Sequence, residues 1–94
     1  MMGTYKDLIE MVVKRELGIL GKDKTFAVLN DLNIIADDDG NVHSIVGDGK
    51  SVLNNLLEEF GKRYGLWAVL GCKISVLKAA NAYHLELPEI LTRK

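Results

Sequence analysis

The sequence is poor in the residues from which catalytic and metal sites are built. It has one cysteine, Cys72, and two histidines, His43 and His84, without H-x-x-x-H or C-x-x-C spacing. A single cysteine excludes an internal disulfide, and three such residues are too few for a zinc site. No serine–histidine–aspartate or paired-carboxylate pattern occurs, and neither histidine is close to Cys72 in sequence. We therefore expect a non-enzymatic protein without metal or cofactor, in which Cys72 is a buried apolar residue.

The chain also lacks a strong charge of one sign. Its net charge is −1, which argues against a general nucleic-acid binder. The charges are unevenly placed: residues 1–59 hold six Lys/Arg and eleven Asp/Glu, whereas residues 60–94 hold six and two. The two halves can neutralise each other within one fold, which is the interpretation we favour. Head-to-tail contact between copies and an anion held at the basic end are the alternatives.

No long apolar run is free of charge. The most apolar stretch, residues 66–85, contains Lys73 and Lys78, and each would cost about 2.5–3.5 kcal/mol at the centre of a bilayer. The first residues are charged and amphipathic, so we expect no signal peptide and no membrane segment. With 94 residues and 48% hydrophobic content, the sequence predicts a single small globular domain, residues 1–94. A lone cysteine among apolar residues favours a cytoplasmic location.

The stretch 66–85 is apolar on nearly all sides when it is drawn as a helix. Such a helix must be surrounded by protein or lipid, so we expect the other elements to enclose it. One side carries short residues, which let another helix approach closely. A chain of this size covers such a helix with difficulty, and we therefore predict a homodimer or a permanent protein partner. The predicted interaction surface comprises Trp67, Ala68, Gly71, Ser75, Ala79 and Ala82.

Two helices are predicted before residue 33. Thr4 is a candidate N-cap, with Asp7 three residues later as an imperfect capping box. Gly18 is the expected end of this first helix. Asp23 is the expected cap of a second helix that ends near Asn33, a residue that tolerates the left-handed conformation. The short link between the two helices predicts an antiparallel pair.

The middle of the chain changes character. Residues 34–36 and 42–46 are β-prone and flank an Asp-Gly pair, which predicts a two-stranded hairpin. Asp48 is the expected N-cap of a third helix that runs to Tyr64 with a clear amphipathic pattern. The predicted fold class is α+β, mainly α, in the order helix–helix–β-hairpin–helix–helix around the apolar C-terminal helix. A short turn through Leu91 follows.

Two loops resemble ligand-binding motifs without matching them. In residues 37–41, the position of Gly40 would place Val46 where a calcium-binding EF-hand loop needs glutamate, so we predict a polar turn. Residues 47–51, GDGKS, end like a phosphate-binding loop, but the glycine that this motif requires is Ser44. Asp48 would also occupy the free N–H groups of the following helix. Neither loop is therefore predicted to be a site.

The function best supported by these patterns is a protein-interaction or regulatory module that self-associates through helix 66–85. The first alternative is a sensor that binds a small apolar or anionic molecule between the third and fourth helices, with Lys73, Lys78 or His84 fixing its polar end. The second alternative is weak binding of single-stranded nucleic acid. Its candidate patch is made of Lys62, Arg63, Tyr64, Trp67, Lys73 and Lys78, and we consider this alternative unfavoured.

Overall fold

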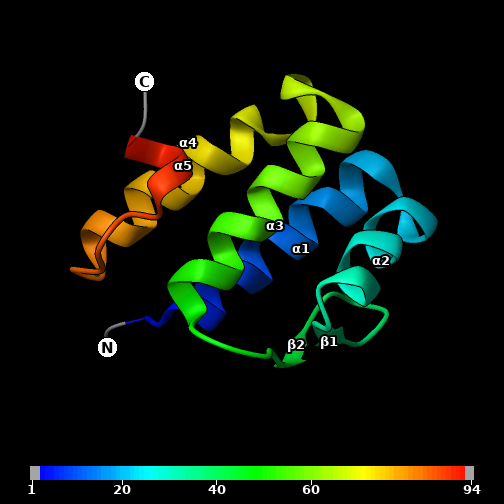
Figure 1. The fold of residues 1–94 in the computed structure, drawn as a ribbon, viewed down its shortest axis with the longest axis horizontal. Helices are drawn as coiled ribbons and strands as arrows, with labels where there is room; N and C mark the ends of the chain where they lie inside the picture. The colour runs from blue at the N-terminus through cyan, green and yellow to red at the C-terminus, as the bar shows by residue number, and fades with distance from the viewer. Residues whose placement is uncertain (1–2, 93–94) are drawn as a thin grey trace.

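The computed structural model describes residues 3–92, which form five helices and one antiparallel two-stranded hairpin (Figure 1). The predicted mainly helical α+β class and the predicted order of elements are confirmed. A short helix replaces the expected final turn. In chain order the elements are α1 (Tyr5–Leu20), α2 (Lys22–Asp31), β1 (Ile35–Ala36), β2 (Val42–Ser44), α3 (Gly49–Tyr64), α4 (Leu66–Ala82) and α5 (Glu89–Thr92).

Helices α1 and α2 are joined by a single residue, Gly21. Thr4 caps α1 as predicted: its hydroxyl accepts a hydrogen bond from Asp7 N–H, and the Asp7 carboxylate accepts one from Thr4 N–H at 2.8 Å. The prediction that Gly18 ends this helix is wrong, and so is the prediction that Asp23 caps the next one. Gly21 has a φ of 85°, which lets the chain end α1 and begin α2 within one residue.

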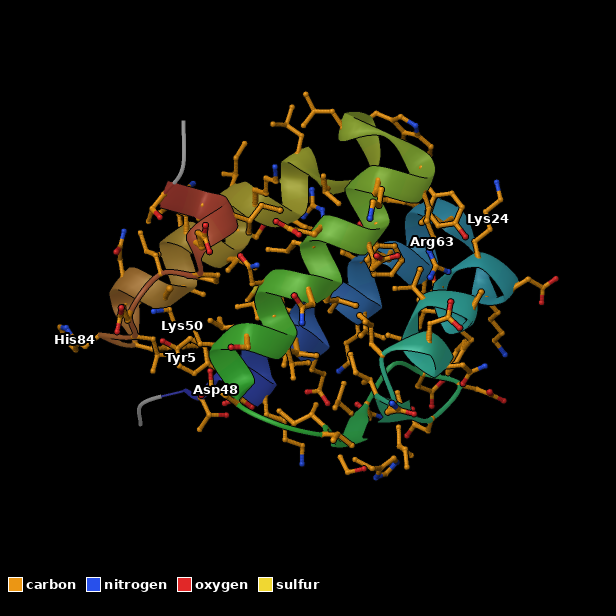
Figure 2. The ribbon with its side chains drawn as sticks, viewed as in Figure 1. Tyr5, Lys24, Asp48, Lys50, Arg63 and His84 are labelled. Atoms are coloured by element: carbon orange, nitrogen blue, oxygen red, sulfur yellow. The ribbon has the colours of Figure 1, made fainter. Side chains whose placement is uncertain are left out.

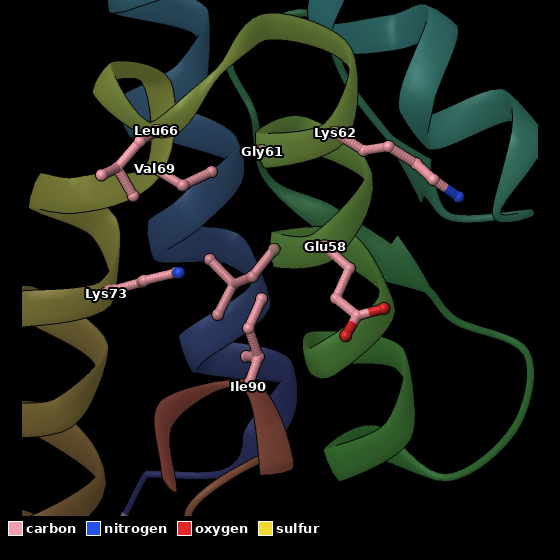
Figure 3. Close-up of a pocket in the computed structure, with 8 residues that line it drawn as sticks. Glu58, Gly61, Lys62, Leu66, Val69, Lys73 and Ile90 are labelled. Carbon is pink, nitrogen blue, oxygen red and sulfur yellow. The ribbon is translucent and has the colours of Figure 1, made fainter. Parts of the chain in front are cut away.

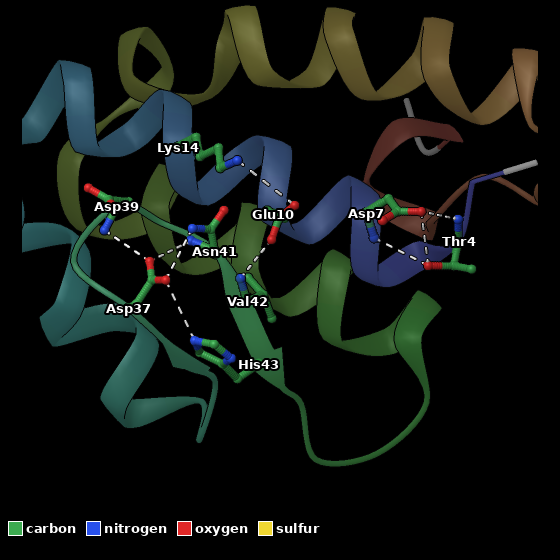
Figure 4. Close-up of polar contacts among 9 residues, drawn as sticks. All are labelled: Thr4, Asp7, Glu10, Lys14, Asp37, Asp39, Asn41, Val42 and His43. Atoms are coloured by element: carbon green, nitrogen blue, oxygen red, sulfur yellow. Dashed lines mark hydrogen bonds and ion pairs between the residues drawn. The ribbon is translucent and has the colours of Figure 1, made fainter.

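The hairpin follows Asn33, whose φ of 57° agrees with its predicted role as a helix terminator. β1 and β2 pair antiparallel, and each is shorter than predicted. At the turn, a Cβ added to Gly40 would lie 2.9 Å from the Leu17 side chain of α1. Val42 N–H donates to the Glu10 carboxylate of α1 at 2.8 Å (Figure 4). Packing and a hydrogen bond thus fix the hairpin to α1. An isolated two-stranded hairpin is only marginally stable and needs such support.

The core lies between α1 and α3. Asp48 caps α3 as predicted, and its carboxylate accepts a hydrogen bond from Ser51 N–H at 3.1 Å. α3 contacts α1, α2, α4 and α5, while α1 contacts α2, α3, α4 and β2. The largest fully buried side chains come mostly from these two helices and include Leu8, Ile9, Leu53, Leu56, Leu57 and Phe60. α4 packs against both helices and adds Val69, Cys72, Val76 and Ala80 to the same core.

The stretch predicted to be enclosed forms α4, and the structure leaves one of its faces exposed. The helix ends at Ala82 instead of Leu85, and His84 follows it with a φ of 58°. The physical reason for the exposure is size, because a chain of 94 residues has too few elements to surround a helix that is apolar on every side. Within residues 3–92, no helix is long and apolar enough to cross a membrane.

The segment after α4 is held against α1 and α3. Tyr5 O–H donates to the Glu86 carbonyl at 2.5 Å, and Lys50 Nζ lies 2.6 Å from the Glu86 carboxylate (Figure 2). Further on, Ile90 N–H donates to Asn54 Oδ1 of α3 at 2.6 Å. These contacts place α5 beside α3 and α4, where it borders the features described next.

Candidate functional site

Large apolar side chains gather on the outer face of α4. Five of them are between 39% and 63% exposed, and we call them the α4 stripe: Leu66, Trp67, Leu70, Ile74 and Leu77. From residue 67 onward, successive members are three or four residues apart, so they lie on one face of the helix. The stripe extends over about 16 Å of helix. A single exposed apolar residue is ordinary, whereas a contiguous set of them marks an interaction surface.

The inner face of α4 is formed by small or β-branched side chains that pack inside the chain. These are Ala68, Val69, Cys72, Val76 and Ala80. Short side chains allow helix backbones to approach closely, and here the neighbouring helices are α1 and α3 of the same chain. The small-residue pattern thus has a use within the chain itself.

The structure separates the six residues of the predicted interaction surface. Trp67 belongs to the exposed α4 stripe, and Ala82 is exposed at the end of α4. Ala79 is half-buried. Ala68 is buried, so it is inaccessible to a partner in this fold.

Gly71 and Ser75, the other two of the six, lie beneath a side chain of α1. Arg15 Nη1 donates to Ser75 Oγ at 3.4 Å. A Cβ added to Gly71 would lie 2.5 Å from Arg15 Nη2, so the guanidinium rests directly on this glycine. The candidate surface therefore moves from the small residues to the α4 stripe, with Trp67 common to both.

A buried polar pair joins α1 to α4. The Cys72 thiol donates to Glu16 Oε1 at 3.0 Å, and both side chains are buried. Burial raises the pKa of the Glu16 carboxyl above 4.5, although the Cys72 thiol and Arg15 act to lower it. Burial, together with the Glu16 carboxylate, raises the pKa of the Cys72 thiol. A protonated, inaccessible thiol is a poor nucleophile, which agrees with the prediction of a structural cysteine.

Sequence reasoning did not identify Glu16 as a buried residue. A signal was present, because Glu16 follows the apolar Val12 by four positions and Ile9 by seven, on the inward face of α1. Its Oε2 atom is buried without a hydrogen-bond partner in the described part of the chain, as is the hydroxyl of Thr25. Buried polar atoms of this kind are costly and influence stability.

A groove of about 360 Å³ lies between α3 and α4, beside α5 (Figure 3). The side chain of Lys73 points into it from α4, whereas Lys78 and His84 do not line it. His84 lies at one extremity of the molecule (Figure 2). The three residues predicted to hold an anionic ligand are therefore not brought together. The apolar lining of the groove comes from Leu57, Leu66, Val69 and Ile90.

The acidic turn before β2 is organised by its own hydrogen bonds (Figure 4). The Asp37 carboxylate accepts from the N–H groups of Asp39 and Asn41, each at 3.0 Å, and from Asn41 Nδ2 at 3.1 Å. The hydrogen bonds from Asn41, and next the one from Asp39, lower the pKa of Asp37. Among residues 3–92, no group of three or more His, Cys, Asp or Glu side chains is placed to hold a metal ion.

The predicted basic and aromatic patch contains residues that are engaged within the fold. Arg63 lies 2.5 Å from the Asp31 carboxylate of α2 and 2.9 Å from that of Glu59. Tyr64 O–H donates to the Lys24 carbonyl at 3.3 Å. Arg63 and Tyr64 thus help to hold α2 against α3.

Comparison with protein-family models, with curated proteins and with solved structures finds no match to this chain. The chemistry available to the chain therefore follows from its own residues. These offer a buried thiol, two exposed imidazoles, an open groove and the α4 stripe. The stripe has the most direct consequence, because covering it with another apolar surface releases water from it.

Proposed function

We propose that this protein is a non-enzymatic interaction module that self-associates through the α4 stripe. The observation that carries the proposal is the exposure of five large apolar side chains on one helix face. The same helix buries its other side against α1 and α3, so the stripe is held in a fixed geometry. A rigid apolar face on a small domain is suited to binding a complementary surface.

The size of the α4 stripe limits the strength of the association. Burying the exposed part of each half-buried side chain contributes on the order of 1 kcal/mol, so two copies gain on the order of 10 kcal/mol. Association costs about 4–15 kcal/mol in lost freedom of motion. The stripe is also smaller than the about 800 Å² that each partner buries in a standard interface. At the low end of this cost, the net gain is about 6 kcal/mol, which corresponds to a weak dimer with a Kd on the order of 10–100 μM.

Leu70→Lys tests the proposal, because Leu70 is 51% exposed and lies within the stripe. Lysine forms helices well and adds a charge that a second apolar surface must desolvate. We expect the variant to keep its helical circular dichroism and to lose self-association, measured by sedimentation equilibrium. The matched control is Val46→Lys, at a residue 68% exposed in the loop before α3, and it should associate like the wild type. Equal association of all three proteins contradicts the proposal.

A small-ligand sensor is the second candidate, and the groove beside Lys73 favours it. Apolar residues line the groove together with Lys73, Lys62 and Glu58, and the Lys73 ammonium group points into it, which suits the polar end of a small amphipathic ligand. A thermal-shift panel of aliphatic carboxylates tests this candidate. Stabilisation of the wild type that disappears in Lys73→Met supports it, whereas no stabilisation by any member of the panel rejects it.

A further inference from the structure

Two adjacent residues of α1 contact α4 in different ways. Arg15 is exposed, and its guanidinium rests on Gly71 and donates to Ser75 Oγ at 3.4 Å. Glu16 is fully buried, and its Oε1 atom accepts from the Cys72 thiol at 3.0 Å. The contact between the two helices therefore contains an ionisable carboxyl group that is shielded from water.

A negative charge on Glu16 is poorly compensated in the closed fold. Its Oε2 atom has no hydrogen-bond partner in the described part of the chain, and the thiol that contacts Oε1 is a weak donor. The buried residues of α2, β2 and α3 include no ionisable side chain, and Cys72 is the only one among those of α4. Within α1, the charged group that acts on this carboxyl is Arg15. Burial outweighs these contributions and raises the pKa of Glu16 above 4.5.

Helix α4 can move away from this contact without disrupting the other helices. Helices α1, α2 and α3 contact one another directly, and α5 is the one described element that follows α4. The large apolar side chains of the α4 stripe are already exposed, and the residues that α4 buries are mostly small: Ala68, Val69, Cys72, Val76 and Ala80. A segment that withdraws few large apolar side chains from the core opens at a lower free-energy cost than the whole domain.

We propose that Glu16 is a pH-sensitive switch in the contact between α1 and α4: its neutral form keeps α4 packed, and its ionised form favours an open state in which α4 has moved away and Cys72 is exposed. The carboxylate reaches water only in the open state, so ionisation favours opening. This inference does not depend on the proposed self-association.

The direction of the pH dependence follows from the raised pKa of Glu16. Below pH 4.5, the carboxyl is neutral in both the closed and the open state, and ionisation does not favour opening. Between pH 4.5 and the folded-state pKa, the ratio of open to closed protein rises by about tenfold for each pH unit. Above the folded-state pKa, the ratio is constant.

Thiol labelling tests the switch, because Cys72 is the only cysteine of the chain and lies on the buried face of α4. The rate of labelling by a pyridyl disulfide, divided by the rate for an unfolded peptide of residues 69–75, measures the open fraction at each pH. We expect this ratio to rise above pH 4.5 in the wild type and to lack this rise in Glu16→Gln, which cannot ionise. Glu89→Gln is the control for the same chemical change outside the core. The same pH profile in the wild type and Glu16→Gln would overturn the inference.

Urea distinguishes the opening of α4 from global unfolding. The dependence of an unfolding free energy on urea concentration scales with the surface that becomes exposed. We therefore expect the labelling ratio of the wild type to depend less steeply on urea than global unfolding does, measured by circular dichroism. Equal dependence would mean that Cys72 becomes accessible only when the whole domain unfolds. That result would overturn the switch and leave the effect of Glu16 on overall stability standing.

Amide hydrogen exchange gives a second readout that needs no reagent. Amides on the buried face of α4, such as those of Val69 and Val76, should be less protected than those of Leu56 and Leu57 at the centre of α3. Equal protection of the two helices would overturn the inference, because α4 would then open only together with the core.

Discussion

Glu16 should make the stability of this protein fall as the pH rises. Its side chain is fully buried, and one carboxylate oxygen has no hydrogen-bond partner among the described residues. Burial raises the pKa of this carboxyl in the folded state above its ordinary value of 4.5. The folded protein therefore keeps a proton that the unfolded chain releases, and every increase in pH within this range favours unfolding.

The magnitude follows from the linkage between proton binding and folding. Below pH 4.5, both states hold the proton and Glu16 causes no loss of stability. Between pH 4.5 and the folded-state pKa, the free energy of unfolding falls by about 1.4 kcal/mol for each pH unit. Above the folded-state pKa, the loss is complete and constant. Asp37 acts in a separate range, because its pKa is lowered and its contribution is lost only as the pH falls below 3.8.

Glu16→Gln isolates this effect, since it preserves the shape of the side chain and an oxygen that accepts from Cys72. We expect the free energy of unfolding of the variant, minus that of the wild type, to rise as the pH increases above 4.5 and to become constant above the folded-state pKa of Glu16. Urea denaturation at several pH values measures the difference. Glu89→Gln, at an exposed carboxylate, is the matched control for a glutamate-to-glutamine change outside the core. A flat difference for Glu16→Gln would refute the reasoning.

Three further tests address packing and capping through the free energy of unfolding in urea. Gly40→Ala should be destabilising by about 1–3 kcal/mol, because φ of Gly40 is 89° and the added Cβ would meet the Leu17 side chain. Gly18→Ala is the contrasting variant and should be stabilising by about 0.5–1 kcal/mol, because Gly18 lies within α1 and its added Cβ would meet no other atom. Phe60→Ala should cost about 3–5 kcal/mol, because it empties the centre of the core. Asp48→Ala should cost about 1 kcal/mol through the lost α3 cap. Wild-type stability in Gly40→Ala, Phe60→Ala or Asp48→Ala would contradict the packing or capping described for that residue.

Local features of this fold could be predicted from the sequence because they depend on residues close together in the chain. The apolar pattern from Val52 to Phe60 identifies the buried face of α3, and the structure buries all of its members. Thr4 and Asp48 cap their helices through atoms only three residues away. Periodicity and capping therefore gave the right elements in the right order.

Features that depend on distant contacts could not be predicted in the same way. α4 is apolar on every side, so its sequence has no pattern that distinguishes the face covered by α1 and α3 from the exposed face. Glu16 is buried because Cys72, 56 residues away, lies opposite it. Gly18 and Gly21 are equally plausible helix ends in sequence, and the positive φ of Gly21 distinguishes them in the structure. For α4 and Glu16, packing between elements determined the outcome.

The most direct test of self-association through the α4 stripe is the solution mass of the wild-type protein as a function of its concentration. Light scattering between about 10 μM and about 1 mM covers the range expected for a weak dimer. The account predicts a mass that rises from near 10.4 kDa toward twice that value. Added salt should preserve or strengthen the association, because Lys73 and Lys78 accompany an apolar contact and salt screens their repulsion. A constant 10.4 kDa across the whole range would contradict the account.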